Sequence, residues 1–439
     1  MSSELLCSSQ VCVTSSTNRL YTMGKKVLVI GSGGREHAIV DALSRSPQVD
    51  KIFCAPGNAG IAAQAQCVAI KDTDVEGLKA FAIEQGIDLT VVGPEAALAA
   101  GVVDAFRAEG LKIFGHSKAA TRIESSKEFA KQLMVKYDIP TAAYQAFDNY
   151  DQAKAYVDRT GVPTVLKYDG LAAGKGVVVA MTAQEADEAL RDMLLDESFG
   201  KGRVVIEEFL EGPEFSLMCF VCGDKLYPMP VAQDHKRAFD GDMGPNTGGM
   251  GAYTCLPFIT DEDMEYAMSK IMRPTAAAMV AEGCPLTGVL YGGLMKTPNG
   301  IKVIEFNARF GDPETEVVLP LISSDICEIF EAVATDTPCA EPTWESLATL
   351  GIVLASKGYP GSYEKGFVIN GLDAVDAQVY HMGTAAKEGQ IVTAGGRVMI
   401  VVCKAATLVE AHAKANAEVA KIECDNLFYR KDIGHKAFK

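Results

Sequence analysis

The sequence lacks the long apolar runs and the leader that would place it in or across a membrane. No stretch approaches the ~18 apolar residues of a membrane span. The opening MSSELLCSSQVCVTSSTNRLYT has no basic segment followed by an apolar one, and Met23-Gly24-Lys25 resembles a natural start. We therefore expect a cytoplasmic protein without membrane association. Residues 1–22 are set aside as an extension expected to be disordered, a cloning remnant or a weak targeting segment.

Paired cysteine spacings are also missing. Twelve cysteines are scattered singly through apolar stretches, which indicates buried, reduced thiols rather than a disulfide framework. The one CxxC, from Cys219 to Cys222, lies in the apolar run FSLMCFVCGD, and no second CxxC completes a zinc site. We therefore expect no zinc site there.

Positive charge is in deficit as well. Forty-one basic residues stand against 57 acidic ones, which gives a net charge of −16 at pH 7. A field of this sign repels nucleic acid and anionic membranes, so neither is expected as a partner. A ligand that carries phosphate must be held by local groups.

What is present indicates an α/β protein of several domains. The 439 residues, 48% of them hydrophobic and 22% charged, suit two to four domains, and no internal repeat or low-complexity tract is present. Residues 24–122 alternate strands and helices, beginning with KKVLVIGSGGREHAIVDALSRS, and this alternation predicts a parallel sheet.

A second unit is expected to begin near Ser125, which has capping-box spacing with Glu128 ahead of the helical run FAKQLMVKY. The segments PTVLKYDG, GVVVAMT, RVVIEEFL and EFSLMCFVCGD read as strands, with one helical insertion, and predict a small α+β module. A later helix leads into a hairpin that turns at Thr297–Gly300. The segment TDTPCAEPTWES is a candidate boundary before a last α/β unit.

The first glycine turn, GSGGREH, follows a strand and opens a helix, so its backbone N–H groups can hold an anion. Glu36 replaces the third glycine of the dinucleotide fingerprint. The second strand ends in APGN, at Asn58, rather than in an acidic residue that would bind an NAD ribose. The turn therefore favours a sugar phosphate, and the alternative is a turn without any ligand.

Two further motifs fit a nucleotide. The loop LKYDGLAAGKG is longer than a hairpin needs and carries two lysines, so we expect it to cover phosphates. Lys167 would be a fixed charge, whereas Lys175 is either a loop ligand or a solvated tip. The stretch VVIEEFLEGPE can read an adenine through its backbone, with a nearby carboxylate on the ribose, although acidic residues after a strand are often only solvated.

Residues 234–251, DHKRAFDGDMGPNTGGMG, form a long loop dense in charges and glycines. Long loops inside compact domains are uncommon unless they are functional. We interpret this one as a substrate loop, with surface disorder as the alternative.

The stretch VIEFNARFGDPE places Glu305, Asn307 and Arg309 on one face of a strand, about 6.6 Å apart along the chain. Ile304, Phe306 and Ala308 are expected to pack into the core. The carboxylate and the amide are hard oxygen donors for Mg²⁺ on nucleotide phosphates. The guanidinium can meet the charge of a transferring phosphoryl group. The alternative, three groups that merely face water, does not account for the adjacent GDPE.

Ten motifs in order resemble one family. GSGGREH, APGNAG, VGPE, ESSK, LKYDGLAAGKG, IEEFLEG, QDHKR, GPNTGGMGAY, VIEFNARFGDPE and FYRKDIG, across residues 25–435, resemble the phosphoribosylamine–glycine ligases, ATP-grasp enzymes of purine synthesis. The resemblance implies an N-terminal parallel-sheet (pre-ATP-grasp) domain at 23–123 that binds phosphoribosylamine. It also implies an ATP-grasp core at 124–335 with a mobile lid at about 143–213, and a small C-terminal α/β domain at 336–439.

The same resemblance assigns roles to residues. It implies Mg²⁺ or Mn²⁺ on Glu305 and Asn307, and catalytic roles for Arg309, Asp312 and Lys167. ATP, a co-substrate, would contact Lys127, Lys167, Lys175, Glu207, Glu208, Phe209, Leu210 and Glu214. The other substrates would contact Gly33, Gly34, Arg35, Glu36, Asn58, Asp234, Lys236, Arg237 and Arg309. The sequence departs from the family's KADG at Tyr168 and from its usual GPEAP at Ala97.

The implied reaction joins glycine to 5-phosphoribosylamine with ATP through a glycyl phosphate, and its partners are these small molecules. We expect a monomer or weak dimer, and transient contact with neighbouring purine-pathway enzymes is left open. Three alternatives stay open: a dinucleotide-dependent oxidoreductase, another ATP-grasp ligase or biotin-dependent carboxylase, and a non-catalytic nucleotide sensor.

Overall fold

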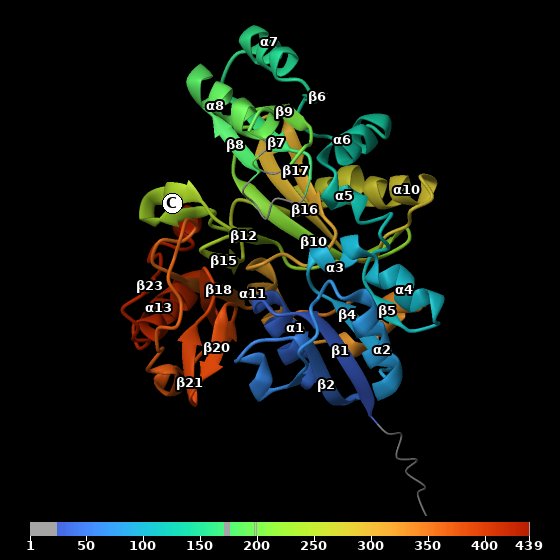
Figure 1. Ribbon diagram of the computed structural model, residues 1–439, viewed down its shortest axis with the longest axis vertical. Helices are drawn as coiled ribbons and strands as arrows, with labels where there is room; N and C mark the ends of the chain where they lie inside the picture. The colour runs from blue at the N-terminus through green and yellow to red at the C-terminus, as the bar shows by residue number, and fades with distance from the viewer. Residues whose placement is uncertain (1–23, 171–175, 197, 199, 439) are drawn as a thin grey trace, which may run out of the picture.

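The N-terminal part of the chain forms the predicted parallel sheet. The structure is a computed structural model that describes residues 24–170, 176–196, 198 and 200–438, so the predicted extension at 1–22 lies outside it. Five parallel strands run in the order β3-β2-β1-β4-β5. They are β1 Lys25–Gly31, β2 Val49–Pro56, β3 Gln66–Cys67, β4 Leu89–Val92 and β5 Ile113–Phe114, and their helices are α1 Gly34–Ser44, α2 Val75–Gln85, α3 Glu95–Ala100 and α4 Val102–Ala108. This sheet lies at the bottom of Figure 1, in blue.

A four-stranded antiparallel sheet forms the opposite end of the molecule (Figure 1). Its order is β6-β9-β7-β8, with bounds β6 Tyr144–Phe147, β7 Thr164–Tyr168, β8 Val177–Ala180 and β9 Val204–Glu208. Helices α7 Tyr150–Thr160 and α8 Ala183–Leu194 pack on it. These elements share a hydrophobic cluster of their own, in which Leu166, Leu190 and Ile206 are buried. Tyr168 belongs to the same cluster.

A ten-stranded antiparallel sheet joins the middle and the end of the chain. Its main path is β17-β16-β10-β12-β15-β18-β22-β19. Strands from before and after the predicted boundary TDTPCAEPTWES therefore belong to one sheet. The bounds are β10 Glu214–Cys222, β11 Lys225–Pro228, β12 Ala232–Asp234, β15 Gly251–Thr254, β16 Thr287–Thr297, β17 Gly300–Asn307, β18 Ala348–Ser356, β19 Gln378–His381, β22 Arg397–Ala405 and β23 Leu427–Phe428. Two small hairpins accompany it: β13 Arg237–Phe239 with β14 Met243–Asn246, and β20 Thr384–Lys387 with β21 Gln390–Thr393.

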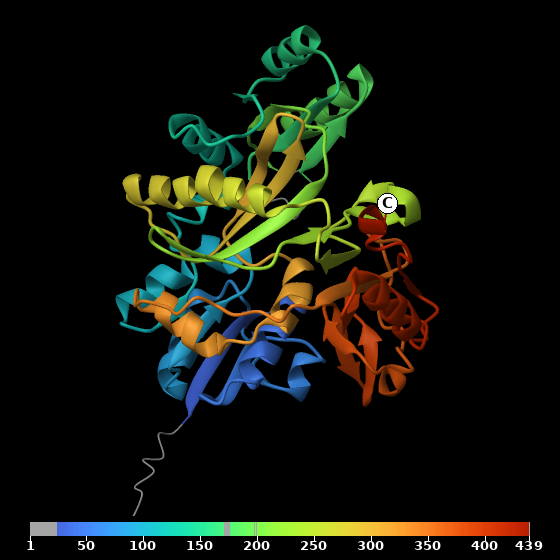
Figure 2. The same cartoon turned by 180° about the vertical axis from the view of Figure 1, so that it is seen from behind.

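The remaining helices cover this sheet or link it to its neighbours. They are α5 Arg122–Ser125, α6 Lys127–Lys136, α9 Asp261–Tyr266, α10 Arg273–Ala281, α11 Glu314–Val318, α12 Ile326–Ala334 and α13 Leu408–Val419. A π-helical segment, Ala267–Met272, joins α9 to α10. Seen from behind in Figure 2, α9 and α10 form one long rod across the central strands. No helix of the described part of the chain is long and apolar enough to span a membrane.

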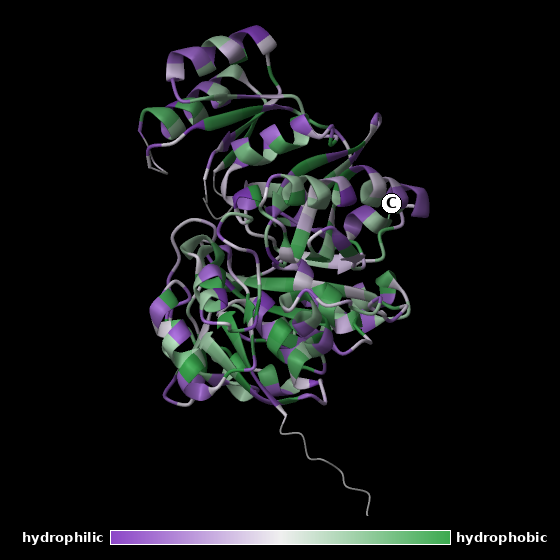
Figure 3. Ribbon diagram, turned by 90° about the vertical axis from the view of Figure 1, so that its right-hand side faces the viewer, coloured by the Kyte–Doolittle hydropathy of each residue, from purple (hydrophilic) through white to green (hydrophobic). Residues whose placement is uncertain are grey.

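Hydropathy follows the layers of the fold. In Figure 3 the strands are mainly hydrophobic, whereas the outer helices carry hydrophilic residues. Phe310, which follows β17, packs among the aromatic rings of Phe114, Phe220 and Phe330. These rings come from β5, β10 and α12, so the end of β17 is fixed against both the N-terminal and the ten-stranded sheet.

The predicted mixed α/β architecture and the hairpin turn at Thr297–Gly300 are confirmed. The predicted small module is wrong in one strand, because EFSLMCFVCGD forms β10 of the ten-stranded sheet. The predicted helix cap is wrong by one residue. Ser126, not Ser125, caps α6, because its hydroxyl accepts the N–H of Phe129 while Ser125 ends α5. The loop at 234–251 is also more regular than expected, since it contains the β13–β14 hairpin.

Candidate active site

A cavity of about 330 Å³ lies where the three sheets meet. Seven basic side chains line it: Arg35, Lys127, Lys131, Lys167, Lys236, Arg309 and Arg397. Seven acidic side chains also line it: Glu95, Glu124, Glu207, Asp234, Glu305, Asp312 and Glu314. Although the whole chain is strongly acidic, basic side chains equal acidic ones in this cavity, so an anionic ligand would find local cations here.

Strand β17 supplies the oxygen donors of the cavity. Glu305 and Asn307 line it, and Phe306 and Ala308 are buried, as predicted, although Phe306 also borders the cavity. The expectation for Ile304 is wrong, because Ile304 is only half-buried and lines the cavity. The pairing with β16 shifts there: Gly293 opposes Glu305 and Leu294 opposes Val303, which leaves Ile304 as the extra residue of a bulge.

Lysines hold Glu305 in its charged form. Burial alone would raise the pKa of Glu305, but Lys167, Lys236 and Lys127 together keep it below its ordinary value. Lys127, at the start of α6, donates to the carbonyl of Gly170 at 3.0 Å. Burial lowers the pKa of Lys127, with Glu305 acting in the opposite direction. Glu305 and Lys127 therefore each favour the charged form of the other.

One buried carboxylate holds two lysines in the cavity. Glu207 Oε1 lies 3.0 Å from Lys167 Nζ, and its Oε2 lies 2.8 Å from Lys131 Nζ. Lys167 also donates to the carbonyl of Ile304 at 2.8 Å. Burial lowers the pKa of Lys131 to about 8, against the pull of Glu207. Sequence reasoning missed Lys131, and the available signal was its place four residues after Lys127 on one face of a helix.

Two carboxylates from other elements fix Arg309. Nη2 of Arg309 lies 2.9 Å from Glu124 Oε1, and its Nε lies 3.3 Å from Glu95 Oε2. Glu124 also accepts the N–H of Ala308 at 2.7 Å. Glu124 and Glu95 raise the pKa of Arg309 although burial opposes this. The sequence did not reveal either partner, since they lie about two hundred residues away along the chain.

Asp312 is tied to the C-terminal part of the chain. Its Oδ1 lies 2.9 Å from Nη2 of Arg397, whose Nη1 donates to the carbonyls of Gly248 and Asp312 at 2.8 and 3.0 Å. Arg397 lies on β22 and was not among the predicted site residues. It joins the GDPE turn, the 234–251 segment and the ten-stranded sheet at one point.

The first glycine turn meets the cavity through Arg35. This guanidinium donates to Glu36 at 2.6 Å and to the carbonyl of Phe310 at 3.1 Å. Glu36 takes the N–H of Gly33 at 2.5 Å, so one donor of the predicted anion site is already used. Gly34 packs so closely on α11 that a Cβ there would collide with Oε1 of Glu316.

Several predicted contacts lie elsewhere. Asn58 bridges the carbonyls of Ser32 and His381, both at 2.8 Å, and neither it nor Glu36 lines the cavity. Arg237 donates to the carbonyl of Gly244 on the hairpin and is also outside. As substrate contacts these residues stay predictions. Lys175 falls outside the described residues.

The segment predicted for adenine borders a second hollow of about 530 Å³. Glu208, Phe209 and Leu210 line this hollow, opposite the hairpin turn at Pro298 and Asn299. Glu214 lies at the start of β10, where its carboxylate is 3.5 Å from Lys236 Nζ. The adenine and ribose contacts stay predictions.

The residues predicted for a metal fit Mg²⁺ or Mn²⁺ in their chemistry. Glu305 is kept anionic, and Asn307 adds a neutral oxygen in the same cavity. Within the described residues no group of three or more His, Cys, Asp or Glu side chains is arranged to hold a metal. This set suits an ion that takes its other ligands from water and from substrate phosphates.

Sequence and structure comparisons agree with this geometry. Family models described as phosphoribosylglycinamide synthetase match residues 25–124 (N domain), 125–315 (ATP-grasp domain) and 349–436 (C domain). The phosphoribosylamine–glycine ligase of Halalkalibacterium halodurans is 55% identical, covering 94% of this chain and 97% of the relative. That of Vibrio cholerae is 48% identical, with coverages of 94% and 98%.

Solved structures give the same result. A phosphoribosylamine–glycine ligase from Thermotoga maritima superposes with a TM-score of 0.81 at 32% identity, covering 93% of this chain and all of that one. A biotin carboxylase domain from Hydrogenobacter thermophilus, with a TM-score of 0.71 at 15% identity and coverages of 92% and 91%, shares the fold alone. Fold and cavity define an ATP-grasp protein. Within that class, the chain belongs to the phosphoribosylglycinamide synthetase family, the phosphoribosylamine–glycine ligases.

Proposed function

We propose that this protein catalyses the ATP-dependent joining of glycine to 5-phosphoribosylamine in purine synthesis, with glycinamide ribonucleotide, ADP and phosphate as products. The observation that supports the proposal is a single cavity lined by Glu305 and Asn307 together with Lys127, Lys167 and Arg309. Its curated relatives are named for the same ligation.

The chemistry explains why such a cavity is needed. A carboxylate is a poor electrophile, so an oxygen of the glycine carboxylate first attacks the γ-phosphorus of ATP and ADP leaves. The resulting glycyl phosphate carries a good leaving group. The sugar amine then attacks the carbonyl carbon, the C–O bond to phosphate breaks, and the amine loses a proton. Both steps depend on positioning and charge neutralisation rather than on a covalent nucleophile of the protein.

Each fixed charge has a place in these steps. Lys127 and Lys167 bind the ATP phosphates. Arg309, held by two carboxylates, neutralises the charge on the phosphoryl group as it transfers. Asp312, oriented by Arg397, binds the ammonium group of glycine.

Glu305 and Asn307 would hold Mg²⁺ or Mn²⁺. The ion would supply positive charge to the β- and γ-phosphates. Lys127 and Lys167, which line the same cavity, would complete this neutralisation. The same lysines lower the pKa of Glu305 and so keep it charged for the ion.

Phosphoribosylamine would occupy the part of the cavity that Arg35, Asp234 and Lys236 line, next to the Gly33–Gly34 turn. The four-stranded sheet with α7 and α8 would act as the lid, at about residues 143–213, because it has a hydrophobic core of its own. The implied domain limits, the adenine contacts at Glu207–Leu210 and Lys175 as a lid ligand belong to the same proposal. A monomer or weak dimer is expected.

The test is ADP release with Mg²⁺-ATP, glycine and freshly generated phosphoribosylamine, against controls that omit one substrate each. We expect release to require all three, with glycinamide ribonucleotide identified by mass spectrometry. Release that persists without glycine or without the sugar amine would refute the assignment. Release that depends on bicarbonate and biotin would instead support a carboxylase, whose members share this fold.

A further inference from the structure

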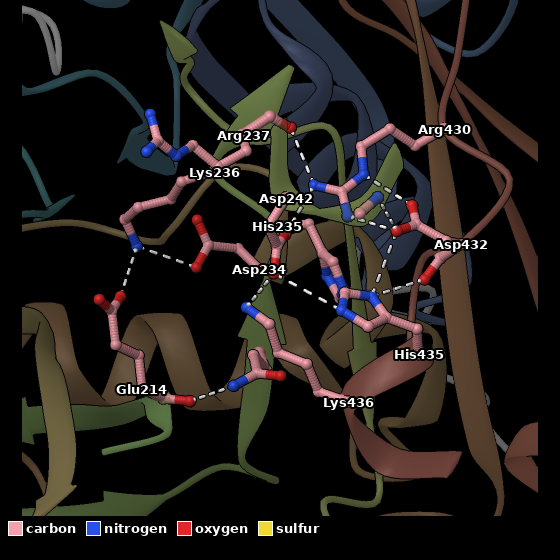
Figure 4. A network of polar contacts seen from close by, with 12 residues as sticks. Glu214, Asp234, His235, Lys236, Arg237, Asp242, Arg430, Asp432, His435 and Lys436 are labelled. Carbon is pink, nitrogen blue, oxygen red and sulfur yellow. Dashed lines mark hydrogen bonds and ion pairs between the residues drawn. The ribbon is translucent and has the colours of Figure 1, made fainter. Parts of the chain in front are cut away.

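Asp234 ends β12, and His235 and Lys236 form the link from β12 to β13. Asp234 and Lys236 line the cavity, with Lys236 Nζ 2.9 Å from Asp234 Oδ1. His235, between them, points the other way and is fully buried. Its Nε2 accepts the N–H of Gly434 at 3.3 Å, and its ring lies 5.3 Å from that of His435 (Figure 4). The buried side of this link is therefore covered by the end of the FYRKDIG motif and by His435 after it.

Arg430 is the main link between the C-terminal segment and the β13–β14 hairpin. Its side chain is 0% exposed. Nε donates to Oδ1 of Asp432 and Nη2 donates to Oδ2, both at 2.8 Å. Nη1 donates to the carbonyl of Arg237 at 2.9 Å and lies 3.0 Å from Oδ1 of Asp242 (Figure 4). A planar guanidinium with a fixed fork can satisfy all these acceptors at once, which a lysine cannot do.

Backbone groups close the same interface. The N–H of Gly241 donates to Asp432 at 2.8 Å, and the N–H of Lys431 donates to Asp240 at 2.9 Å, across 191 residues of chain. Figures 1 and 2 both show the C-terminus against this hairpin. Gly241 and Asp242 have φ values of 70° and 57°, a left-handed conformation that is costly for Asp242 and needs support from its surroundings.

We propose that Arg430, oriented by Asp432, is a positioning residue of this enzyme. It fixes the β13–β14 hairpin and thereby the link at residues 235–236 that joins it to β12, and so keeps Asp234 and Lys236 at the cavity. The identity of the substrate that these two residues bind rests on the proposed function: it is a substrate other than ATP, either the phosphorylated sugar amine or glycine. The lysines and the adenine segment proposed for ATP lie on α6, β7 and β9, and no hydrogen bond or ion pair among the described residues joins them to 430–436. Glu214, the predicted ribose contact, is 3.5 Å from Lys236 Nζ, so the effect on ATP is expected to be smaller rather than absent.

The first measurement is steady-state ADP release by Arg430→Lys and Asp432→Asn variants of the full chain, with each substrate varied in turn. We expect the KM for the sugar amine or for glycine to rise at least ten-fold while the KM for ATP stays within about two-fold. Lys421→Gln, which removes a surface ion pair with Glu418 on α13, is the matched control and should change none of these. Equal changes for all three substrates, or none, would overturn the proposal.

Hydrogen exchange provides a readout that needs no substrate. We expect Arg430→Lys to speed exchange in residues 234–246 and to leave 204–210 unchanged. If exchange in 234–246 does not change, the positioning role is wrong whichever substrate the enzyme uses. If it speeds up while the wild type ignores glycine and phosphoribosylamine, the proposed function fails and the positioning role stands. If the Arg430 variant does not fold, Asp240→Ala replaces it in this experiment. This change removes the acceptor of the Lys431 N–H on an exposed turn, and we expect a smaller rise in exchange in 234–246.

Discussion

Glu207 Oε1 lies 3.0 Å from Lys167 Nζ across two adjacent strands of the four-stranded sheet. Lys167 opposes Val205 in the register of β7 and β9, so Glu207, two residues further on, is its diagonal neighbour on the same face. Lys131 reaches the second carboxylate oxygen from α6. A single buried anion thus joins the four-stranded sheet to the helix beneath it and holds two cations where the phosphates of ATP are expected.

Replacing this anion should destabilise the free protein. Glu207→Gln leaves two ammonium groups without their shared partner in a site where Glu207 is only 4% exposed, so we expect a loss on the order of 3 kcal/mol in the free energy of unfolding. Urea unfolding without nucleotide measures it. The control is Glu208→Gln, whose carboxylate pairs at the surface with Lys302 at 3.4 Å and should matter by no more than about 0.5 kcal/mol. Equal effects at the two positions would contradict the buried arrangement.

The metal assignment makes a separate prediction for Glu305→Gln. Because lysines keep Glu305 charged, the amide removes a negative ligand without removing its shape. We expect the Mg²⁺ concentration for half-maximal ADP release to rise at least about ten-fold, since even indirect supports of a metal site cost that much. Glu282→Gln, a surface carboxylate paired with Lys136, is the control. Wild-type turnover of Glu305→Gln in limiting Mg²⁺ would rule out the metal role.

The local motifs were predictable because their geometry follows from short-range rules. Strand alternation put Glu305 and Asn307 on one face, and a strand followed by a glycine turn gave the GSGGREH helix start. The bulge at Ile304 was not predictable, because it depends on the register with β16, which the sequence of β17 does not contain. The cap of α6 failed by one residue because the preceding helix extends to Ser125.

Long-range ion pairs were the other failure. Glu95 and Glu124 acquire their roles only when Arg309 approaches from far along the chain, and Arg397 acquires its role only beside Asp312. The β13–β14 hairpin is held by residues 430–436, so its own glycine-rich sequence read as a loop. Which charged residues share a cavity is thus a property of the assembled sheets.

Arg309 should be sensitive to a change that keeps its charge. Arg309→Lys retains one cation but loses the fork that Glu124 and Glu95 hold at 2.9 and 3.3 Å, so the charge no longer lies where the phosphoryl group transfers. We expect kcat to fall by roughly 10²–10³, as for loss of one preorganised donor. ATP affinity measured by calorimetry should change less than three-fold.

Arg191→Lys is the matched control, because that arginine forms an exposed pair with Asp187 on α8. It should leave kcat unchanged. A fall in ATP affinity as large as the fall in kcat would move Arg309 from the transferring group to ground-state nucleotide binding.

The pH dependence of stability should report His116, which joins the N-terminal region to β16. Its Nδ1 accepts the N–H of Thr287 at 2.8 Å, and its Nε2 donates to the carbonyl of Val289 at 2.9 Å. The contact with Thr287 needs the neutral ring, because a proton on Nδ1 would face the N–H of Thr287. The bond from Nε2 to Val289 is possible in both forms of the ring and acts to raise the pKa. Burial, with a smaller effect from Arg107, lowers the pKa of His116 to about 4.

A histidine in the unfolded chain has a pKa of about 6.5. Between about pH 6.5 and about pH 4, therefore, the unfolded chain binds a proton at His116 and the folded protein does not. The contribution of His116 is complete above the unfolded pKa and is lost as the pH falls toward the folded one, by roughly 3 kcal/mol in all. His37 and His381, whose pKa values burial lowers to about 3 and about 4, act in the same direction, so the comparison must be with a variant. Urea unfolding of wild type and His116→Gln at pH 7.5 and pH 4.5 should show a difference that shrinks on acidification. An equal difference at the two pH values would mean that the proton does not compete with the hydrogen bond from Thr287.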